Sequence, residues 1–460
     1  MNKAVFAVLL VAGCATQAPY QPPAVELPDA WRGAAPAPRF AEDGRWWRIY
    51  GDPQLDVLAD EALSRNSDLL IAAARVDEAR ALLAEARSGA TPSIGAQAGA
   101  TRQGLSQRTA TSFPGMPREF TTHQAALNIS YEVDLFGRIR AGTEAARAEL
   151  AASEAAREAV RLALVAEVAR AYFALRALDE QIAVTGRTIA LREEALKLQR
   201  RRYDGGVISE YDLRQLEAEA AAVRAQLPPL QRARETEETA LAALLGRSPR
   251  RMLETGILRT AAFGETPGPA VLPPGLPSEL LLRRPDLVAA ERSLAAAHAR
   301  VAVARAERFP SIALTGALGV ESAALSTLFT GPAGLWFVAA SAAQPIFNGG
   351  RLEARTEAAE ARNRAALAQY EKAIQTAFAE VRIALAAQAR AREAFDAEST
   401  RASALADTLR LARLRYHAGI ASQLDVLDAE RGLLAAELSR IEALRAQRAA
   451  VADLFRALGG

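Results

Sequence analysis

The sequence predicts a mainly α-helical protein with a smaller β component, built from two similar halves. Half of the 460 residues are hydrophobic but only 6% are aromatic, and alanine dominates the apolar fraction. Alanine combined with glutamate, arginine and leucine is typical of long, closely packed helices. Long stretches of helical periodicity alternate with short segments of period two. A Tyr, Gly, Ser, Asp pattern also occurs twice, which indicates an internal repeat: Tyr203, Gly206, Ser209 and Asp212 correspond to Tyr416, Gly419, Ser422 and Asp425.

Composition and charge argue against several classes of function. The net charge is +2 and arginine alternates with glutamate along the chain, so nothing indicates nucleic-acid binding. The three histidines are far apart and there is one cysteine, which leaves neither a zinc site nor a disulfide framework. No nucleophile–base arrangement or phosphate-binding loop is recognisable. We therefore expect no enzyme activity, no cofactor and no metal.

The N-terminus is typical of a bacterial export signal that ends at a cysteine. An apolar run leads to Leu10-Val11-Ala12-Gly13-Cys14, which resembles a lipobox. We expect residues 1–13 to be a signal peptide, Cys14 to be lipid-modified and residues 14–52 to form a proline-rich, extended tether. The alternative is a plain secretory peptide with an incidental free cysteine. No later run reaches the roughly 18 apolar residues of a membrane helix, so any spanning segment has to be β.

The first repeat is predicted over residues 53–247. It opens with a helix from Gln54 to Arg87, with Asp52 as the N-cap and a proline in the first turn. A β-hairpin follows over residues 91–136. In its second strand, apolar residues from Leu127 to Leu135 alternate with polar ones, which fits a membrane β-barrel strand with lipid outside and water inside. A half-buried strand of an ordinary sheet shows the same alternation and is the alternative.

From Gly137 the helical pattern continues unbroken to Asp204. At ~1.5 Å per residue these roughly 67 residues make a rod about 100 Å long, which is typical of a coiled coil. The Gly205-Gly206 turn reverses the chain, and a shorter helix follows from Ser209 to Leu245. We expect Pro228-Pro229 to break or kink that helix. A linker rich in glycine and proline, residues 248–276, then joins the repeats.

The second repeat, residues 277–460, has the same order of elements. A helix ends at Arg308, a β-hairpin covers residues 310–347, a long helix runs from Arg351 to His417, and a last helix runs from Ser422 to Leu458. Four strands per chain are too few to close a membrane barrel. Open sheet edges in lipid would leave backbone groups without hydrogen bonds. A membrane-spanning form must therefore be an oligomer.

Several short motifs, in this order along the chain, carry a family resemblance. They are the lipobox at Cys14, Trp46-Trp47 with Asp52-Pro53-Gln54-Leu55, the run from Tyr131 to Arg138, Arg283-Arg284-Pro285-Asp286-Leu287, the run from Pro345 to Gly350, and both glycine turns. Each motif is weak alone, but the ordered set is specific. It resembles the outer membrane factors of Gram-negative bacteria, the TolC, OprM and NodT-type channels, over essentially the whole mature chain. Asn348 departs from the family, which usually has aspartate there.

The resemblance implies a homotrimer with a long α-helical coiled-coil barrel and a 12-stranded β-barrel in the outer membrane, to which each chain contributes four strands. The implied partners are outer membrane lipid, a periplasmic membrane fusion adaptor and an inner-membrane pump of the RND type. The implied function is the exit duct of a tripartite efflux system for drugs or other small molecules. The alternatives are the exit duct of a type I protein secretion system and, in a different class, a structural periplasmic coiled-coil lipoprotein without a pore.

The second glycine turn carries the expected pore gate. Asp425 and Asp428 are three residues apart and so project from one helix face, and threefold symmetry would turn each into a ring of carboxylates as in cation-selective pores. TolC-like members have two aspartates at these positions, and Leu424 matches a constricting leucine of OprM-like members. The resemblance therefore implies a gate of Leu424, Asp425 and Asp428. In the alternative, both aspartates simply face solvent on a charged helix.

The resemblance also implies a latch at the same end of the helices. Asp212 and Tyr416 match residues that hydrogen-bond across the coils, although an arginine of this network in TolC falls at Ala421 here. Packing of Tyr416 as a helix-end aromatic residue is the alternative. The adaptor is expected to dock on both turns, although ordinary turn chemistry explains the same glycines. The residues expected to dock it are Gly205, Gly206, Val207, Ser209, Gly419, Ile420 and Ser422.

Overall fold

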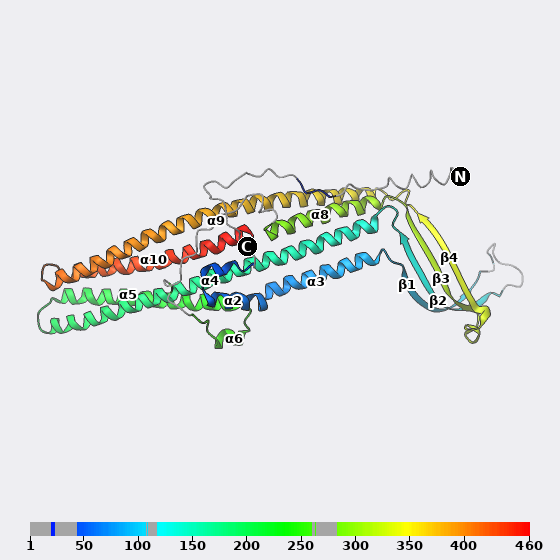
Figure 1. Ribbon diagram of the computed structural model, residues 1–460. Coiled ribbons are helices and arrows are strands. Elements are labelled where there is room, and N and C mark those ends of the chain that lie inside the picture. Colours follow the sequence, from blue (N-terminus) through cyan, green and yellow to red (C-terminus); the bar gives the residue numbers. More distant parts are fainter. Residues whose placement is uncertain (1–19, 24–43, 107, 109–116, 260–262, 264–282) are drawn as a thin grey trace. The chain divides into compact units, whose positions relative to one another are not determined.

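A computed structural model describes most of the chain (Figure 1). The described residues are 20–23, 44–106, 108, 117–259, 263 and 283–460. The expected signal peptide, the lipidation site at Cys14, most of the expected tether and part of the expected linker lie outside these residues.

The chain packs as two compact units, and each unit draws segments from both predicted repeats. Unit 1 contains Met1–Ala24, Arg75–Glu154 and Ala289–Glu371. Unit 2 contains Val25–Ala74, Ala155–Val288 and Lys372–Gly460. The two compact units are therefore not the two predicted repeats. The division of the sequence into repeats refers to the order of the elements along the chain, and it stays a prediction.

The elements follow the predicted order twice. In the first half they are η1 (Trp46–Tyr50), α2 (Pro53–Arg65), α3 (Ser67–Ser88), β1 (Ser93–Gly104), β2 (Glu119–Val133), α4 (Arg138–Asp204), α5 (Glu210–Leu244) and α6 (Pro249–Glu254). In the second half they are α8 (Pro285–Ala306), β3 (Ser311–Ser322), η3 (Leu325–Thr327), η4 (Gly331–Ala333), β4 (Gly334–Ala343), α9 (Arg351–His417) and α10 (Gln423–Leu458). The two long helices, α4 and α9, have the bounds that the periodicity predicts. The mainly helical fold with four antiparallel strands is confirmed.

The prediction of one helix from Gln54 to Arg87 is wrong, because the chain divides at Asn66 into α2 and α3. Asn66 has an extended backbone conformation, and its side-chain oxygen accepts hydrogen bonds from the backbone N–H groups of Asp68 (2.9 Å) and Leu69 (3.2 Å). Its side-chain nitrogen donates to the carbonyl of Leu244, at 2.9 Å. Asn66 therefore acts as the N-cap of a new helix and anchors it to α5.

Of the predicted break or kink at Pro228-Pro229, the break is wrong, since both prolines lie inside α5, and the kink stays a prediction. A proline in a helix leaves the carbonyl four residues earlier without its donor. Here those carbonyls belong to Arg224 and Ala225, and these residues and both prolines are exposed. Water can therefore satisfy the freed carbonyls, and the helix continues.

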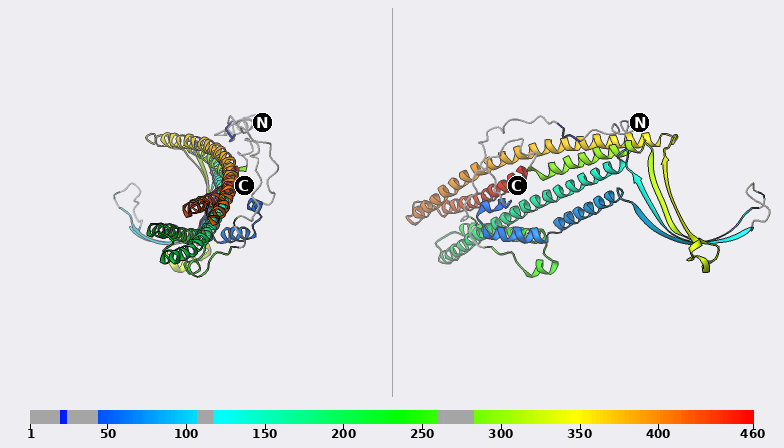
Figure 2. Two further views of the ribbon diagram at one scale, coloured as in Figure 1. Left: turned by 90° about the vertical axis from the view of Figure 1, so that its left-hand side faces the viewer. Right: turned by 45° about the vertical axis from the view of Figure 1, so that its right-hand side comes forward.

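The strands form one antiparallel sheet in the order β1-β2-β3-β4, side by side in Figure 1 and in the right-hand view of Figure 2. Two hairpins, β1–β2 and β3–β4, are joined where β2 pairs with β3, from His123 opposite Ser322 to Val133 opposite Ile312. At this seam a Cβ on Gly319 would lie 2.4 Å from the carbonyl oxygen of Ala125, so only glycine fits. Strands β1 and β4 are the edges, and within the described part of the chain each pairs with one strand.

The main hydrophobic core lies in unit 2, where η1 packs against α4 and α10. Trp46 stacks on Phe455, with ring centroids 4.8 Å apart, and the Tyr50 hydroxyl donates to the carbonyl of Arg448 at 2.7 Å. Trp46, Trp47 and Tyr50 are each at most 4% exposed. The aromatic run that the sequence places after the tether is therefore a core element. Among the described residues, no helix is both long and apolar enough to cross a membrane.

Candidate functional site

Two glycine turns in unit 2 connect α4 to α5 and α9 to α10, and they are built alike. Gly206 and Gly419 have φ values of +71° and +73°, in the left-handed region that side chains rarely adopt. The N–H of Val207 donates to the carbonyl of Arg202, and that of Ile420 to Arg415, at 2.8 and 3.0 Å. These bonds close the last turn of each long helix and satisfy its free carbonyls. We refer to the two turns together as the paired tip.

A capping box follows each turn. The Ser422 Oγ accepts from the N–H of Asp425, while the Asp425 Oδ2 accepts from the N–H (2.7 Å) and hydroxyl (2.9 Å) of Ser422. Ser209 and Asp212 form the same box at the start of α5. The hydrogen bonds from Ser422 lower the pKa of Asp425, because they stabilise the ionised carboxylate. Both aspartates of the repeated pattern therefore have a local structural role.

The expected gate residues lie together at the start of α10, on its exposed surface. Leu424 is 46% exposed, and Asp425 and Asp428 are exposed as well. Asp428 lies 3.5 Å from the Arg431 guanidinium, so it faces a cation of its own helix. The seven expected docking residues are all exposed at the paired tip, with Val207 and Ile420 at 64% and 67%.

The two expected latch residues have separate partners within the chain. The Tyr416 hydroxyl accepts hydrogen bonds from Arg202 at 2.9 Å and from Gln199 at 3.4 Å, which links α9 to α4. Asp212 bonds to Ser209 in its capping box. In the described part of the chain no hydrogen bond joins Asp212 to Tyr416. The two long helices are linked here by a hydrogen bond from Arg202 to Tyr416, and Asp212 is not part of that link.

Sequence reasoning missed a group of charged residues that contacts four helices near the paired tip. We call it the four-helix ion network. At its centre is Arg192 of α4, whose side chain is 4% exposed and donates to Glu219 of α5 at 2.9 Å. Its guanidinium is also 3.9 Å from Glu430 of α10. Arg413 of α9 pairs with Glu430, and Arg431 of α10 pairs with Glu219, at 2.9 and 2.7 Å. The two helical hairpins of unit 2 are thereby tied together by charge.

A second set of charges that the sequence did not reveal lies in the core of unit 2. Asp52, the confirmed N-cap of α2, also accepts from Arg176 at 2.6 Å and from the Tyr172 hydroxyl at 3.0 Å. The side chains of Asp52 and Arg176 are 3% and 1% exposed. Nearby, Arg448 lies over the ring of Phe263, 4.6 Å from its centroid. Burial, and secondarily the Arg176 cation, lowers the pKa of Arg448 to about 10.

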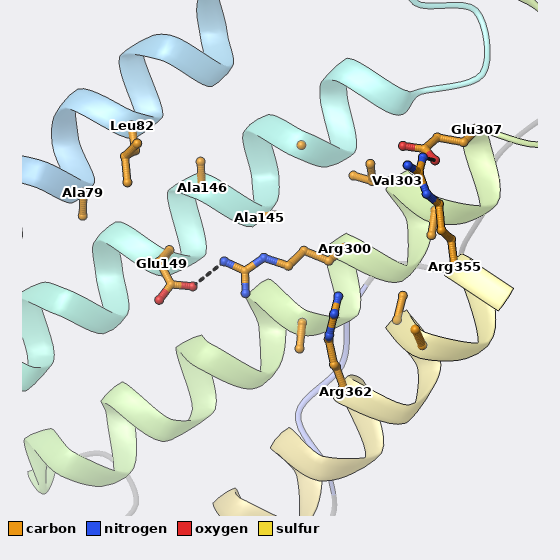
Figure 3. Close-up of a pocket in the computed structure, with 15 residues that line it drawn as sticks. Ala79, Leu82, Ala145, Ala146, Glu149, Arg300, Val303, Glu307, Arg355 and Arg362 are labelled. Carbon is orange, nitrogen blue, oxygen red and sulfur yellow. Dashed lines mark hydrogen bonds and ion pairs between the residues drawn. The ribbon is translucent and has the colours of Figure 1, made fainter. Parts of the chain in front are cut away.

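A cavity of about 670 Å³ lies in unit 1 among four helices. We call it the wall cavity. Figure 3 shows its lining, mostly small apolar side chains with five charged ones. The lining residues are Ala79, Leu82, Gly142, Ala145, Ala146, Glu149, Ala297, Arg300, Val303, Ala304, Glu307, Arg355, Ala358, Ala359 and Arg362. Across the described residues, no group of three or more histidine, cysteine, aspartate or glutamate side chains is placed to hold a metal ion.

Comparison with known proteins gives consistent results along nearly the whole chain. The sequence model described as "Outer membrane efflux protein" matches residues 58–247 and 276–460. The chain is 36% identical to outer membrane protein OprJ of Pseudomonas aeruginosa, over all of this chain and 97% of that protein. It is 33% identical to the probable outer membrane lipoprotein SilC of Salmonella typhimurium, over 98% and 97% of the two chains. The crystal structure of the Campylobacter jejuni CmeC outer membrane channel superposes with a TM-score of 0.89 at 25% identity, covering 97% and 94%.

Proposed function

This chain belongs to the outer membrane efflux protein family, and from that membership we propose that three copies form the outer-membrane exit duct of a tripartite efflux system. The family consists of outer-membrane efflux channels rather than enzymes.

One observation supports the assembly most directly: the four described strands form an open sheet with β1 and β4 at its edges. In lipid, unpaired edge groups cost several kcal/mol each, so a membrane-spanning sheet has to close. Pairing β4 of one copy with β1 of the next closes it, and three copies give a barrel of 12 strands. The apolar side chains Leu127 and Ile129 of β2 are 50% and 45% exposed in the single chain, as expected for residues that face lipid.

The proposed partners are a periplasmic membrane fusion adaptor at the paired tip and an inner-membrane pump of the RND type. The paired tip supports this proposal because exposed apolar residues, Val207 and Ile420, lie beside exposed glycines that allow a close approach. The proposed cargo is drugs or other small molecules. The test is deletion of the gene for this chain, which should raise susceptibility to pump substrates, with restoration by the unchanged gene. Loss of only protein export on deletion would instead favour a secretion duct.

In the closed duct, Leu424, Asp425 and Asp428 are proposed to form the constriction, and the two aspartates to favour cations. Because Asp425 also caps α10, its replacement by alanine would change both the charge and the helix start. Asparagine is the better substitution, since it keeps a side-chain oxygen for the cap. We expect Asp425→Asn with Asp428→Asn to reduce the preference for K⁺ over Cl⁻ several-fold in planar bilayers.

The pH dependence follows from the lowered pKa of Asp425. When folding lowers the pKa of a carboxyl group, the group is ionised at any pH above its ordinary pKa. It loses its charge only when the pH falls through the lowered pKa. We therefore expect cation selectivity to stay constant from about pH 8 to about pH 5 and to decline only in more acidic solution. A steep loss of selectivity between about pH 7 and 6 would contradict this expectation, since it would indicate either a histidine or carboxylates close enough in the assembled mouth to raise one another's pKa.

The latch is proposed to be the hydrogen bond from Arg202 to the Tyr416 hydroxyl, with Asp212 joining it only across the assembled mouth. Tyr416→Phe removes the acceptor and keeps the ring, so the packing of a helix-end aromatic residue is unchanged. We expect the link between α9 and α4 to lose about 1 kcal/mol, since it is partly exposed, and the resting conductance to rise. Tyr211→Phe, at an exposed tyrosine of α5, is the control. Equal conductance in the two variants would exclude the latch.

A further inference from the structure

The wall cavity is lined by four helices of unit 1 that lie side by side in the order α3, α4, α8, α9 (Figures 1 and 2). Contacts fix this order: Thr143 of α4 donates to a carbonyl of α3, and Arg300 of α8 pairs with Glu149 of α4 at 2.8 Å. Arg305 of α8 pairs with Glu360 of α9 at 2.6 Å. Because side chains of the outer helices, α3 and α9, reach the same cavity as those of α4 and α8, the layer curves around it.

The charges at the cavity are unbalanced. Three arginines line it, and two of them are neutralised, Arg300 by Glu149 at 2.8 Å and Arg355 by Glu307 at 3.0 Å. Arg362 is exposed on α9, and none of the ion pairs among the described residues includes it. The cavity therefore carries one more positive than negative side chain.

Arg362 of α9 lies beside Arg300 of α8, whose guanidinium is paired with Glu149 of α4. The antiparallel register that pairs Arg305 with Glu360 and Arg355 with Glu307 places Arg362 opposite Arg300. In Figure 3 the Arg362 side chain extends from α9 toward Arg300. Glu149 already neutralises Arg300, so Arg362 is the cation at this place that a bound anion would neutralise. Planar guanidinium groups suit a carboxylate, sulfonate or phosphate, with which each forms charge-assisted hydrogen bonds.

We propose that the wall cavity binds amphiphilic organic anions, with the acidic group held by Arg362, beside the Arg300–Glu149 pair, and the apolar body against the alanine side chains of the lining. Its volume of about 670 Å³ lies within the range of small-molecule sites, which combine an apolar lining with a few polar groups. The small side chains of Ala145, Ala146 and Ala304 leave the space that such a body fills. A cation of the same shape would meet the excess positive charge and bind more weakly.

The placement of this site in the duct depends on the function proposed above, whereas the binding itself does not. In a closed cylinder of helices, the face around which each layer curves is the inner one. The cavity would then be a resting site for anionic cargo in the duct wall, present once in each of three copies. If a side chain of a neighbouring copy or a lipid chain fills the space instead, neither probe binds in the experiment below.

The test compares two probes with the same ring system and opposite charge, 1-pyrenesulfonate and 1-pyrenemethylammonium. Fluorescence anisotropy is titrated on the purified full-length protein in lipid nanodiscs. We expect the sulfonate to bind at least about tenfold more tightly than the ammonium, and Arg362→Ala to weaken sulfonate binding about tenfold, the effect of one charge-assisted hydrogen bond. Ala146→Leu should weaken it as well, because it fills the cavity.

Arg364→Ala is the matched control, because Arg364 is an exposed arginine of the same helix outside the cavity lining. It removes the same charge and should leave sulfonate binding unchanged. Equal binding of the two probes, equal effects of the two arginine variants, or no binding of either probe would overturn the proposal. If the sulfonate binds as expected but deletion of the gene leaves drug susceptibility unchanged, the site stands and the proposed efflux function fails.

Discussion

Replacement of Asp52 by alanine is expected to destabilise unit 2 by about 3–5 kcal/mol, the usual cost of removing one partner of a buried ion pair. The substitution leaves the Arg176 cation in a core where its side chain is 1% exposed, close to the buried Arg448. It also removes the hydrogen bond from Tyr172 and the N-cap of α2. We expect a markedly lower midpoint of thermal unfolding by circular dichroism and a low yield of folded protein in the membrane.

Two further variants separate the charge from the cap. Asp52→Asn keeps an oxygen for the N-cap and loses only the charge, so we expect it to be destabilised nearly as much as the alanine variant. Arg176→Met in that background removes the buried cation that has lost its carboxylate at position 52 and should restore part of the stability. Asp60→Ala breaks an exposed pair with Arg45 and should cost less than about 1 kcal/mol. A small effect of Asp52→Asn would show that the buried pair contributes little.

Replacement of Arg192 by alanine is expected to open the paired tip. Arg192 is the buried member of the four-helix ion network, and its loss leaves Glu219 and Glu430 with only their more exposed partners, Arg431 and Arg413. We expect the contact between the two hairpins of unit 2 to weaken by about 2–3 kcal/mol, less than for an isolated buried pair because each carboxylate keeps one arginine. The measurement is single-channel conductance in planar bilayers, which should rise.

The chain offers a close control for Arg192. Arg224 of α5 pairs with Glu193 of α4 at 2.6 Å, but this pair is exposed and lies within one hairpin. Arg224→Ala should therefore leave the conductance unchanged. Arg192→Lys keeps the charge but cannot donate to two carboxylates with a planar fork, so we expect an intermediate conductance. If both alanine variants conduct alike, the network has no part in closing the tip.

The sequence by itself determined the elements and much of their order. Helical periodicity predicted the bounds of α4 and α9, because apolar residues that keep helical spacing over so many turns fit a helix and neither a strand nor a loop. The repeated Tyr, Gly, Ser, Asp pattern located both turns, since a left-handed glycine followed by a capping box is a local device. The errors arose where one residue type is compatible with two structures. Asn66 can lie inside a helix or cap the start of a new one, and asparagine is the better cap. Proline usually ends a helix, but it is tolerated inside one where water reaches the freed carbonyls.

The tertiary structure alone decided which charges meet. Arg192, Arg176 and Arg362 look alike in the sequence, each an arginine in a helix rich in arginine and glutamate. Packing buries the first against carboxylates of other helices, pairs the second with Asp52 in the core, and places the third at the edge of a cavity lined mostly by small apolar side chains. Periodicity reports which face of a helix is apolar, but the partner of a charge depends on the register between helices far apart in the chain. That register is set by side-chain packing, which is why these three sites appear only in the folded protein.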